Sequence, residues 1–208
     1  MATRYEIPFR LFFIGRRAVR RRVYSGGMKR IDIRDGQTVS AMGKNFTISV
    51  SDGAGKSSRA RTENDTVNIL LAEGIDGRQK NKHVSLLARK AISKSVMPDL
   101  AAKVDGINAR HFCFGLSRLG LKDQKGRWGS YSKGTNSIYL NFRLLFAPED
   151  VLDYVIVHEL AHIKELNHSR NFWRLVENAM PDYKEKRKWL RKNGAALGPS
   201  IAPKPPQS

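Results

Sequence analysis

The chain has 208 residues, of which 40% are hydrophobic, and this suits one domain or slightly more with a real buried core. Its single cysteine, Cys113, excludes a disulfide framework and a cysteine-based zinc site, and it favours a reducing, cytoplasmic setting. No apolar run approaches the ~20 residues that a membrane-spanning helix needs, so we expect a soluble protein without a membrane partner. The net charge of +19 favours polyanionic partners, nucleic acid first, but it fits a soluble enzyme with a basic surface equally well.

The first part of the chain, residues 1–75, is predicted to be rich in strands. The segment 23–33 suggests two strands around a Gly-Gly turn, and apolar and polar residues alternate over 44–53 as in a half-buried strand. Another strand is predicted at 66–74. The polar segment 51–62 lacks the spacing of a phosphate-binding loop, so we expect a turn there.

The hydrophobic period changes near residue 76. Apolar residues recur from Val84 to Ile92 at helical spacing, and Pro98 should end or kink this helix, with a shorter piece reaching Val104. The segments 110–119 and 137–146 are predicted strands, joined by a polar loop.

Three helices are predicted in the last part of the chain. Pro148 suits the first position of one helix, and Ser169 is a plausible N-cap of the next. The third helix runs from about Asp182 to Lys192, with Gly194 as its C-terminal cap. The proline-rich end is expected to be disordered. We therefore divide the chain into a strand-rich region (1–75), a second domain (76–195) and a tail (196–208).

Three of the five histidines lie within the segment 155–173, VIVHELAHIKELNHSRNFW. His158 and His162 are four residues apart on a predicted helix, so both imidazoles lie on one face and can reach a zinc ion at about 2.0–2.1 Å. Glu159 lies about 100° around the helix, where it flanks the metal as a base without binding it. His168 follows Asn167, which we expect to end the helix in the left-handed conformation and to turn the third ligand back.

The alternative is that His158 and His162 are core histidines with satisfied hydrogen bonds. The helix is apolar nearly all round, so Glu159 would be buried beside two imidazoles, which is costly without a partner charge. This cost favours the metal site. His83 and His111 stand alone, and we expect no metal role for them.

Three segments resemble the YgjP-like, SprT-related zinc metallopeptidases: RWGSYS (127–132), the run from Ile138 to Trp173, and MPDYKEKRKWL (180–190). The resemblance implies an α+β, zincin-like metallopeptidase domain with a small sheet over the HExxH helix. It implies zinc bound by His158, His162 and His168, with Glu159 as the general base. SprT relatives are linked to cleavage of DNA-associated proteins, which the charge would suit. The sequence departs from the family at Tyr131, where a cysteine usually follows the WGS motif.

Residues around the motif allow more than one interpretation. Arg127 could stabilise an oxyanion or be a surface cation, whereas Trp128 is expected to be a core anchor. The segment SIYLN (137–141) could be a sheet edge that aligns a peptide or an interior strand. Phe172 and Trp173 are expected to be core residues that fix the loop of His168, and Met180 to pack in the core rather than form a floor under zinc.

Two basic clusters could track phosphates or simply be solvated. One is an N-terminal cluster, and the other is a stripe on the last predicted helix. Their members are Arg16, Arg17, Arg20, Arg21 and Arg22 in the first, and Lys184, Arg187, Lys188 and Arg191 in the second.

The sequence thus predicts a zinc-dependent metallopeptidase that hydrolyses protein or peptide substrates through a metal-activated water, with DNA-associated proteins as a candidate substrate class. One alternative is a zinc hydrolase of nucleotides or other phosphorylated small molecules. A second is a nucleic-acid-binding protein with a structural zinc. Glu159 argues against the second alternative, because a structural site has no use for a base.

Overall fold

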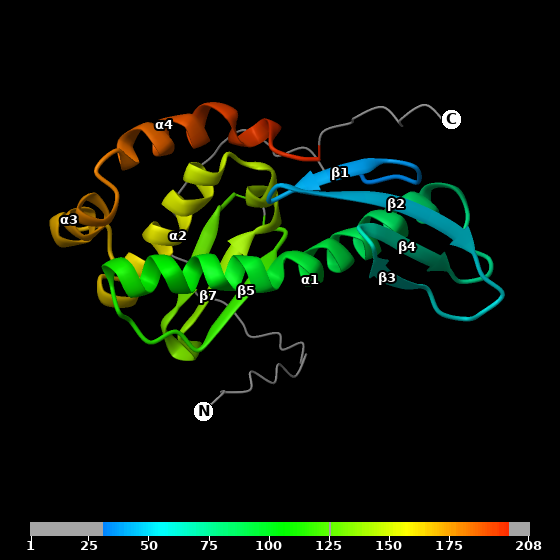
Figure 1. The fold of residues 1–208 in the computed structure, drawn as a ribbon, viewed down its shortest axis with the longest axis horizontal. Helices are drawn as coiled ribbons and strands as arrows, with labels where there is room; N and C mark the ends of the chain where they lie inside the picture. Colours follow the sequence, from blue (N-terminus) through cyan, green and yellow to red (C-terminus); the bar gives the residue numbers. More distant parts are fainter. Residues whose placement is uncertain (1–30, 125, 200–208) are drawn as a thin grey trace.

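The computed structural model describes residues 31–124 and 126–199, which form an α+β fold of two sheets and four α-helices (Figure 1). The long helix α1 runs along both sheets, and the three C-terminal helices gather around the second one (Figure 1). The described helices include none that is long and apolar enough to cross a membrane. The predicted Gly-Gly turn and the Arg16–Arg22 cluster lie outside the described residues.

The N-terminal sheet has the strand order β1-β2-β4-β3, in which β2 and β4 are parallel and the other pairs are antiparallel. Its alternating apolar residues form one buried face against α1, as the pattern in 44–53 predicts. The predicted turn at 51–62 is wrong in its second half, since β3 begins at Arg59 and pairs with β4. The strands are β1 (Thr38–Ala41), β2 (Lys44–Asp52), β3 (Arg59–Glu63) and β4 (Thr66–Leu71).

Helix α1 (Gly77–His111) is continuous through Pro98, so the prediction that the proline could end the helix is wrong. The residues on either side of the proline explain the continuity: Val96 and Leu100 are both fully buried. Val96 packs in the core under the N-terminal sheet, and Leu100 packs in the core of the second half. Burial on both sides outweighs the hydrogen bond that proline removes. The helix also occupies the start of the strand predicted at 110–119.

The second sheet has the order β5-β7-β6, with β5 parallel and β6 antiparallel to the central β7. SIYLN is β7 (Ser137–Asn141) and therefore an interior strand, which excludes its interpretation as a sheet edge. The edge strand beside it is β6 (Gly129–Ser132), which lies within the segment predicted as a loop. β5 is Arg118–Lys122, and the chain leaves β7 in a 3-10 helix, Phe142–Phe146, rather than continuing the predicted strand.

The three predicted C-terminal helices are confirmed as α2 (Glu149–Lys164), α3 (Arg170–Ala179) and α4 (Tyr183–Asn193). Pro148 is the N-cap of α2 rather than its first helical residue. The Ser169 hydroxyl caps α3 by accepting from the Phe172 N–H at 3.2 Å, as predicted. α2 packs against β6, β7, α3 and α4 and is largely buried.

Part of the predicted tail contacts the rest of the molecule. Leu197 is buried, and its carbonyl accepts from the Arg143 guanidinium at 2.6 Å. Residues 200–208 lie beyond the described part, so the division of the chain into three parts stays a prediction.

Candidate metal centre

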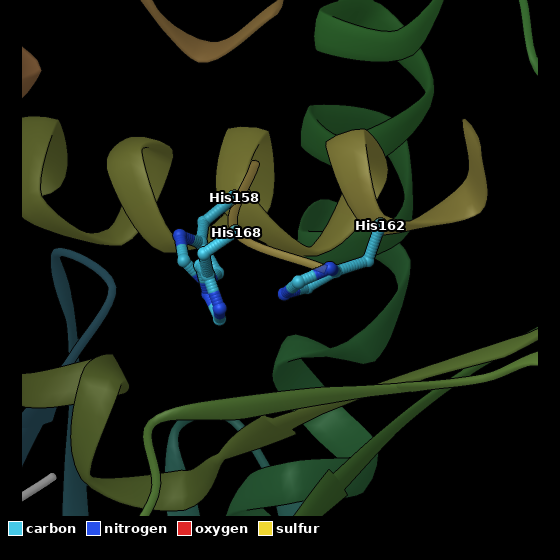
Figure 2. Close-up of side chains that lie close together, drawn as sticks. All are labelled: His158, His162 and His168. Atoms are coloured by element: carbon cyan, nitrogen blue, oxygen red, sulfur yellow. The ribbon is translucent and has the colours of Figure 1, made fainter. Parts of the chain in front are cut away.

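Three imidazoles converge at the C-terminal half of α2, and Figure 2 shows their side chains pointing toward one another. His158 and His162 come from α2, and His168 comes from the segment between α2 and α3. One ligand-capable nitrogen of each lies within 4.8 Å of the others, and the Nε2 atoms of His158 and His168 are 3.0 Å apart. Three nitrogens at such distances can share one cation.

The turn after α2 brings His168 back to the helix without a left-handed residue. Asn167 is not among the described residues with positive φ, so the predicted conformation is wrong. The helix ends instead at Glu165, which is extended and whose N–H still donates to the Ala161 carbonyl at 3.0 Å. The Ser169 N–H then donates to the Asn167 carbonyl at 2.7 Å, which tightens the turn.

The hydrogen bond of His162 fixes its tautomer. Its Nδ1 lies 3.0 Å from the Glu165 backbone carbonyl, which can only accept. Nδ1 therefore carries the hydrogen, and Nε2 keeps its lone pair for a ligand. Backbone carbonyls orient metal-binding histidines in this way in other proteins.

Burial keeps the two helix histidines neutral. It lowers the pKa of His158 well below its usual value, and the nearby charges of His162, His168 and Arg187 lower it further. Burial also lowers the pKa of His162, against the opposing effect of the Glu165 carbonyl. Neutral imidazoles are the form that binds a metal, so the donor set fits zinc.

An aromatic floor lies under the histidines. Phe172 is fully buried, and its ring centroid lies 4.9 Å from that of His158, 4.5 Å from His162 and 4.7 Å from His168. Trp173 lies 5.7 Å from His168. Phe172 is a buried core residue, as expected, whereas Trp173 is only partly buried and packs against the core. The sequence does not reveal that Phe172 lies under all three histidines. Met180 packs against the core, as predicted.

Glu159 is 4% exposed and faces the second sheet. Burial raises its pKa to about 8, although the Arg127 charge and the Tyr131 N–H lower it in part. Its Oε2 has no hydrogen-bond partner in the part of the chain that the structure describes. Gly129 of β6 makes room for it, since a Cβ atom there would lie 2.6 Å from Cγ of Glu159. The glycine of the WGS motif is therefore a site residue that spacing alone does not reveal.

The other singled-out residues take different places. Trp128 is buried in the core, as expected. Arg127 is exposed, and its carbonyl accepts from the Asn141 side chain at 2.9 Å. His83 and His111 are not part of the three-histidine group.

A family model matches most of the chain, and some solved structures resemble part of it. No curated protein matched the chain. Among solved structures, the metallopeptidase zymogen abylysin of Pyrococcus abyssi is 25% identical, with a TM-score of 0.41 over 44% of this chain and 92% of its own. The zymogen jannalysin of Methanocaldococcus jannaschii is 24% identical, with a TM-score of 0.41 over 45% and 94%. Residues 17–193 match the YgjP-like metallopeptidase domain, and the chain therefore belongs to this family of metal-dependent peptidases.

Proposed function

We propose that His158, His162 and His168 hold one zinc ion and that Glu159 is the general base for hydrolysis of a peptide bond. The observation that carries the proposal is the arrangement of three imidazoles within 4.8 Å beside a buried carboxyl group with an unpartnered oxygen. A buried polar atom without a partner is costly and calls for an explanation, and a role in proton transfer supplies one.

Each residue contributes a separate step. Zinc, when bound, lowers the pKa of water to about 7 and polarises the scissile carbonyl. Glu159 Oε2 accepts the proton of the attacking water and returns it to the leaving amine. The Tyr131 N–H donates to this carboxyl group, and Gly129 leaves room for it beside β6. The outer edge of β6 carries no strand in the described structure and can pair with an extended peptide.

Glu159 argues against one of the two alternatives, a structural zinc. A structural zinc needs no buried carboxyl group with an unpartnered oxygen. A nucleotide hydrolase would use the same metal, and no described contact favours it. We expect zinc-loaded protein to cleave a mixed peptide library, to lose this activity with a chelator and to regain it with zinc. Phosphate release from nucleoside triphosphates without any peptide cleavage would instead support the nucleotide hydrolase.

The α4 stripe supports a further proposal, that the substrate is held on DNA. Lys184, Arg187, Lys188 and Arg191 are exposed, and Lys188 and Arg191 form no ion pair within residues 31–124 and 126–199. We expect weak sequence preference and a log–log salt slope of about −0.7 to −0.9 per phosphate neutralised, measured by fluorescence anisotropy. The double variant Lys188→Gln, Arg191→Gln should reduce the slope by about two units. A slope unchanged in that variant would remove α4 from the interface.

A further inference from the structure

Arg187 lies beside the three histidines and forms no ion pair with an acidic residue in the described part of the chain. It is exposed on α4, and its guanidinium carbon lies 4.9 Å from the ring centroid of Trp173. That ring lies 5.7 Å from His168 and 6.0 Å from His158. The positive charge of Arg187 is therefore presented at the rim of the site, and it contributes to the lowered pKa of His158.

The aromatic and ionic contacts of α4 fix the position of Arg187. Tyr183 stacks on Trp173 at 5.3 Å with an interplanar angle of 19°. Lys186 forms ion pairs with Asp150 of α2 at 2.6 Å and with Asp182 at 3.1 Å. These contacts anchor α4 to the helix that carries His158.

Arg127 supplies a second cation from a different element. It lies two residues before Gly129, which contacts Glu159. Its carbonyl and that of Trp128 accept from the Asn141 side chain and backbone N–H, at 2.9 and 2.7 Å, and Asn141 is fully buried. The backbone of Arg127 is therefore held firmly beside the base.

Neither arginine forms a salt bridge with another described residue, whereas several basic side chains elsewhere do. Lys103 pairs with Glu149 and Asp153, and Lys186 pairs with two aspartates. Two exposed arginines beside a peptidase site, neither in a salt bridge within the described residues, favour a substrate that brings its own carboxylates.

We infer that Arg127 and Arg187 select peptide segments with acidic side chains flanking the scissile bond. The inference rests on the proposed peptidase function and names its substrate class. Exposed ion pairs are weak individually, so each arginine should contribute about twofold to fivefold to the preference. The effect of Arg187 should appear in KM rather than kcat, whereas removal of Arg127 should also alter kcat because its charge acts on Glu159. Both effects on the preference should decline as salt screens the charges.

The test uses three otherwise identical peptides with Glu, Gln or Lys on both sides of the cleaved bond. Zinc-loaded protein should show the highest kcat/KM for the Glu peptide. Arg187→Gln and Arg127→Gln should each reduce the preference, and Arg187→Glu should shift it toward the Lys peptide. Arg59→Gln is the matched control, since it removes an exposed arginine of β3 in the N-terminal sheet and should leave the preference unchanged.

A binding measurement separates this inference from the proposed function. The zinc-loaded Glu159→Gln variant should bind the labelled Glu peptide more tightly than the Gln peptide in fluorescence anisotropy. Equal binding, or equal kcat/KM for all three peptides, would overturn the acidic preference and leave the peptidase intact. Absence of cleavage of any peptide by the zinc-loaded wild type would overturn the proposed function.

Discussion

Two buried polar side chains, one in each half of the molecule, differ in how their hydrogen bonds are satisfied. In the N-terminal half, Ser85 is 2% exposed, and its hydroxyl accepts from the Ile33 N–H at 2.7 Å and donates to the Ile33 carbonyl at 3.2 Å. In the C-terminal half, Glu159 is 4% exposed, and neither its Oε2 nor His158 Nδ1 has a hydrogen-bond partner among residues 31–124 and 126–199. A satisfied buried group stabilises a fold, whereas an unsatisfied one costs free energy and calls for an explanation, which a role in metal binding and proton transfer supplies here. We therefore assign a structural role to Ser85 and propose a catalytic role for Glu159.

The largest expected effects come from variants that remove one of these two buried groups, Glu159 or Ser85. Glu159→Gln is nearly isosteric and should lower peptide hydrolysis by about 10²–10⁴-fold while zinc content stays constant, because it removes only the base. Ser85→Ala should lower the free energy of unfolding by about 1–3 kcal/mol, because it leaves the Ile33 backbone groups without a partner. Zinc-loaded Ser85→Ala should keep its turnover. Full hydrolysis by Glu159→Gln would remove Glu159 from the mechanism.

The same carboxyl group should give the metal-free protein a pH-dependent stability. An unfolded Glu159 loses its proton near pH 4.5, whereas the folded one keeps it until about pH 8. The folded state binds more protons between these values, so the free energy of unfolding should fall as pH rises through this window. The Glu159→Gln variant has no such titrating group, so its free energy of unfolding should not fall in this window. The difference in unfolding free energy between the variant and the wild type should therefore increase by about 2–5 kcal/mol from pH 5 to pH 8.

Chemical denaturation at both pH values measures this difference, with Ser85→Ala as the control that keeps the wild-type slope. An equal pH slope in Glu159→Gln and wild type would show that the buried carboxyl group does not carry the effect.

Two glycines, one in each half of the molecule, lie where a Cβ atom has no room. A Cβ atom at Gly53 would lie 2.8 Å from the Leu71 carbonyl oxygen, and one at Gly129 would lie 2.6 Å from Cγ of Glu159. Each substitution to alanine should cost about 1–3 kcal/mol of unfolding free energy through overpacking. Gly129→Ala should also displace Glu159 and reduce kcat, whereas Gly53→Ala should reduce stability alone. Equal kcat in both variants would show that the space at Gly129 does not position the base.

Two buried phenylalanines give the smallest expected effect. Phe46 packs in the N-terminal core, and Phe172 lies under the three histidines. Replacing either by leucine should cost about 1 kcal/mol, measured by thermal unfolding. Phe172→Leu should in addition weaken zinc binding in calorimetry, because the imidazoles lose their floor. Unchanged zinc affinity in Phe172→Leu would show that Phe172 packs in the core without supporting the zinc ligands.

The sequence predicts the site better than the fold around it, because the site depends on local spacing. The helix that carries His158 and His162 follows from its apolar period and its N-terminal residues, and residues four apart on a helix share one face. Ser169 as a cap follows from local chemistry in the same way.

The remaining features depend on tertiary contacts that local pattern does not contain. α1 continues through Pro98 because residues on both sides of it are buried in two different cores. β6 is polar and glycine-bearing, so it resembles a loop until β7 pairs with it. The contact between Gly129 and Glu159 depends on that pairing, so the sequence alone does not reveal it.

The most direct test of the account is the zinc content of purified protein. Elemental analysis should find about one zinc per chain in the wild type and a loss of most of it in His162→Ala, because zinc requires all three imidazoles. His83→Ala should keep the full content, since His83 lies outside the three-histidine group. Full zinc occupancy in His162→Ala would contradict the assignment of His158, His162 and His168 as the metal ligands.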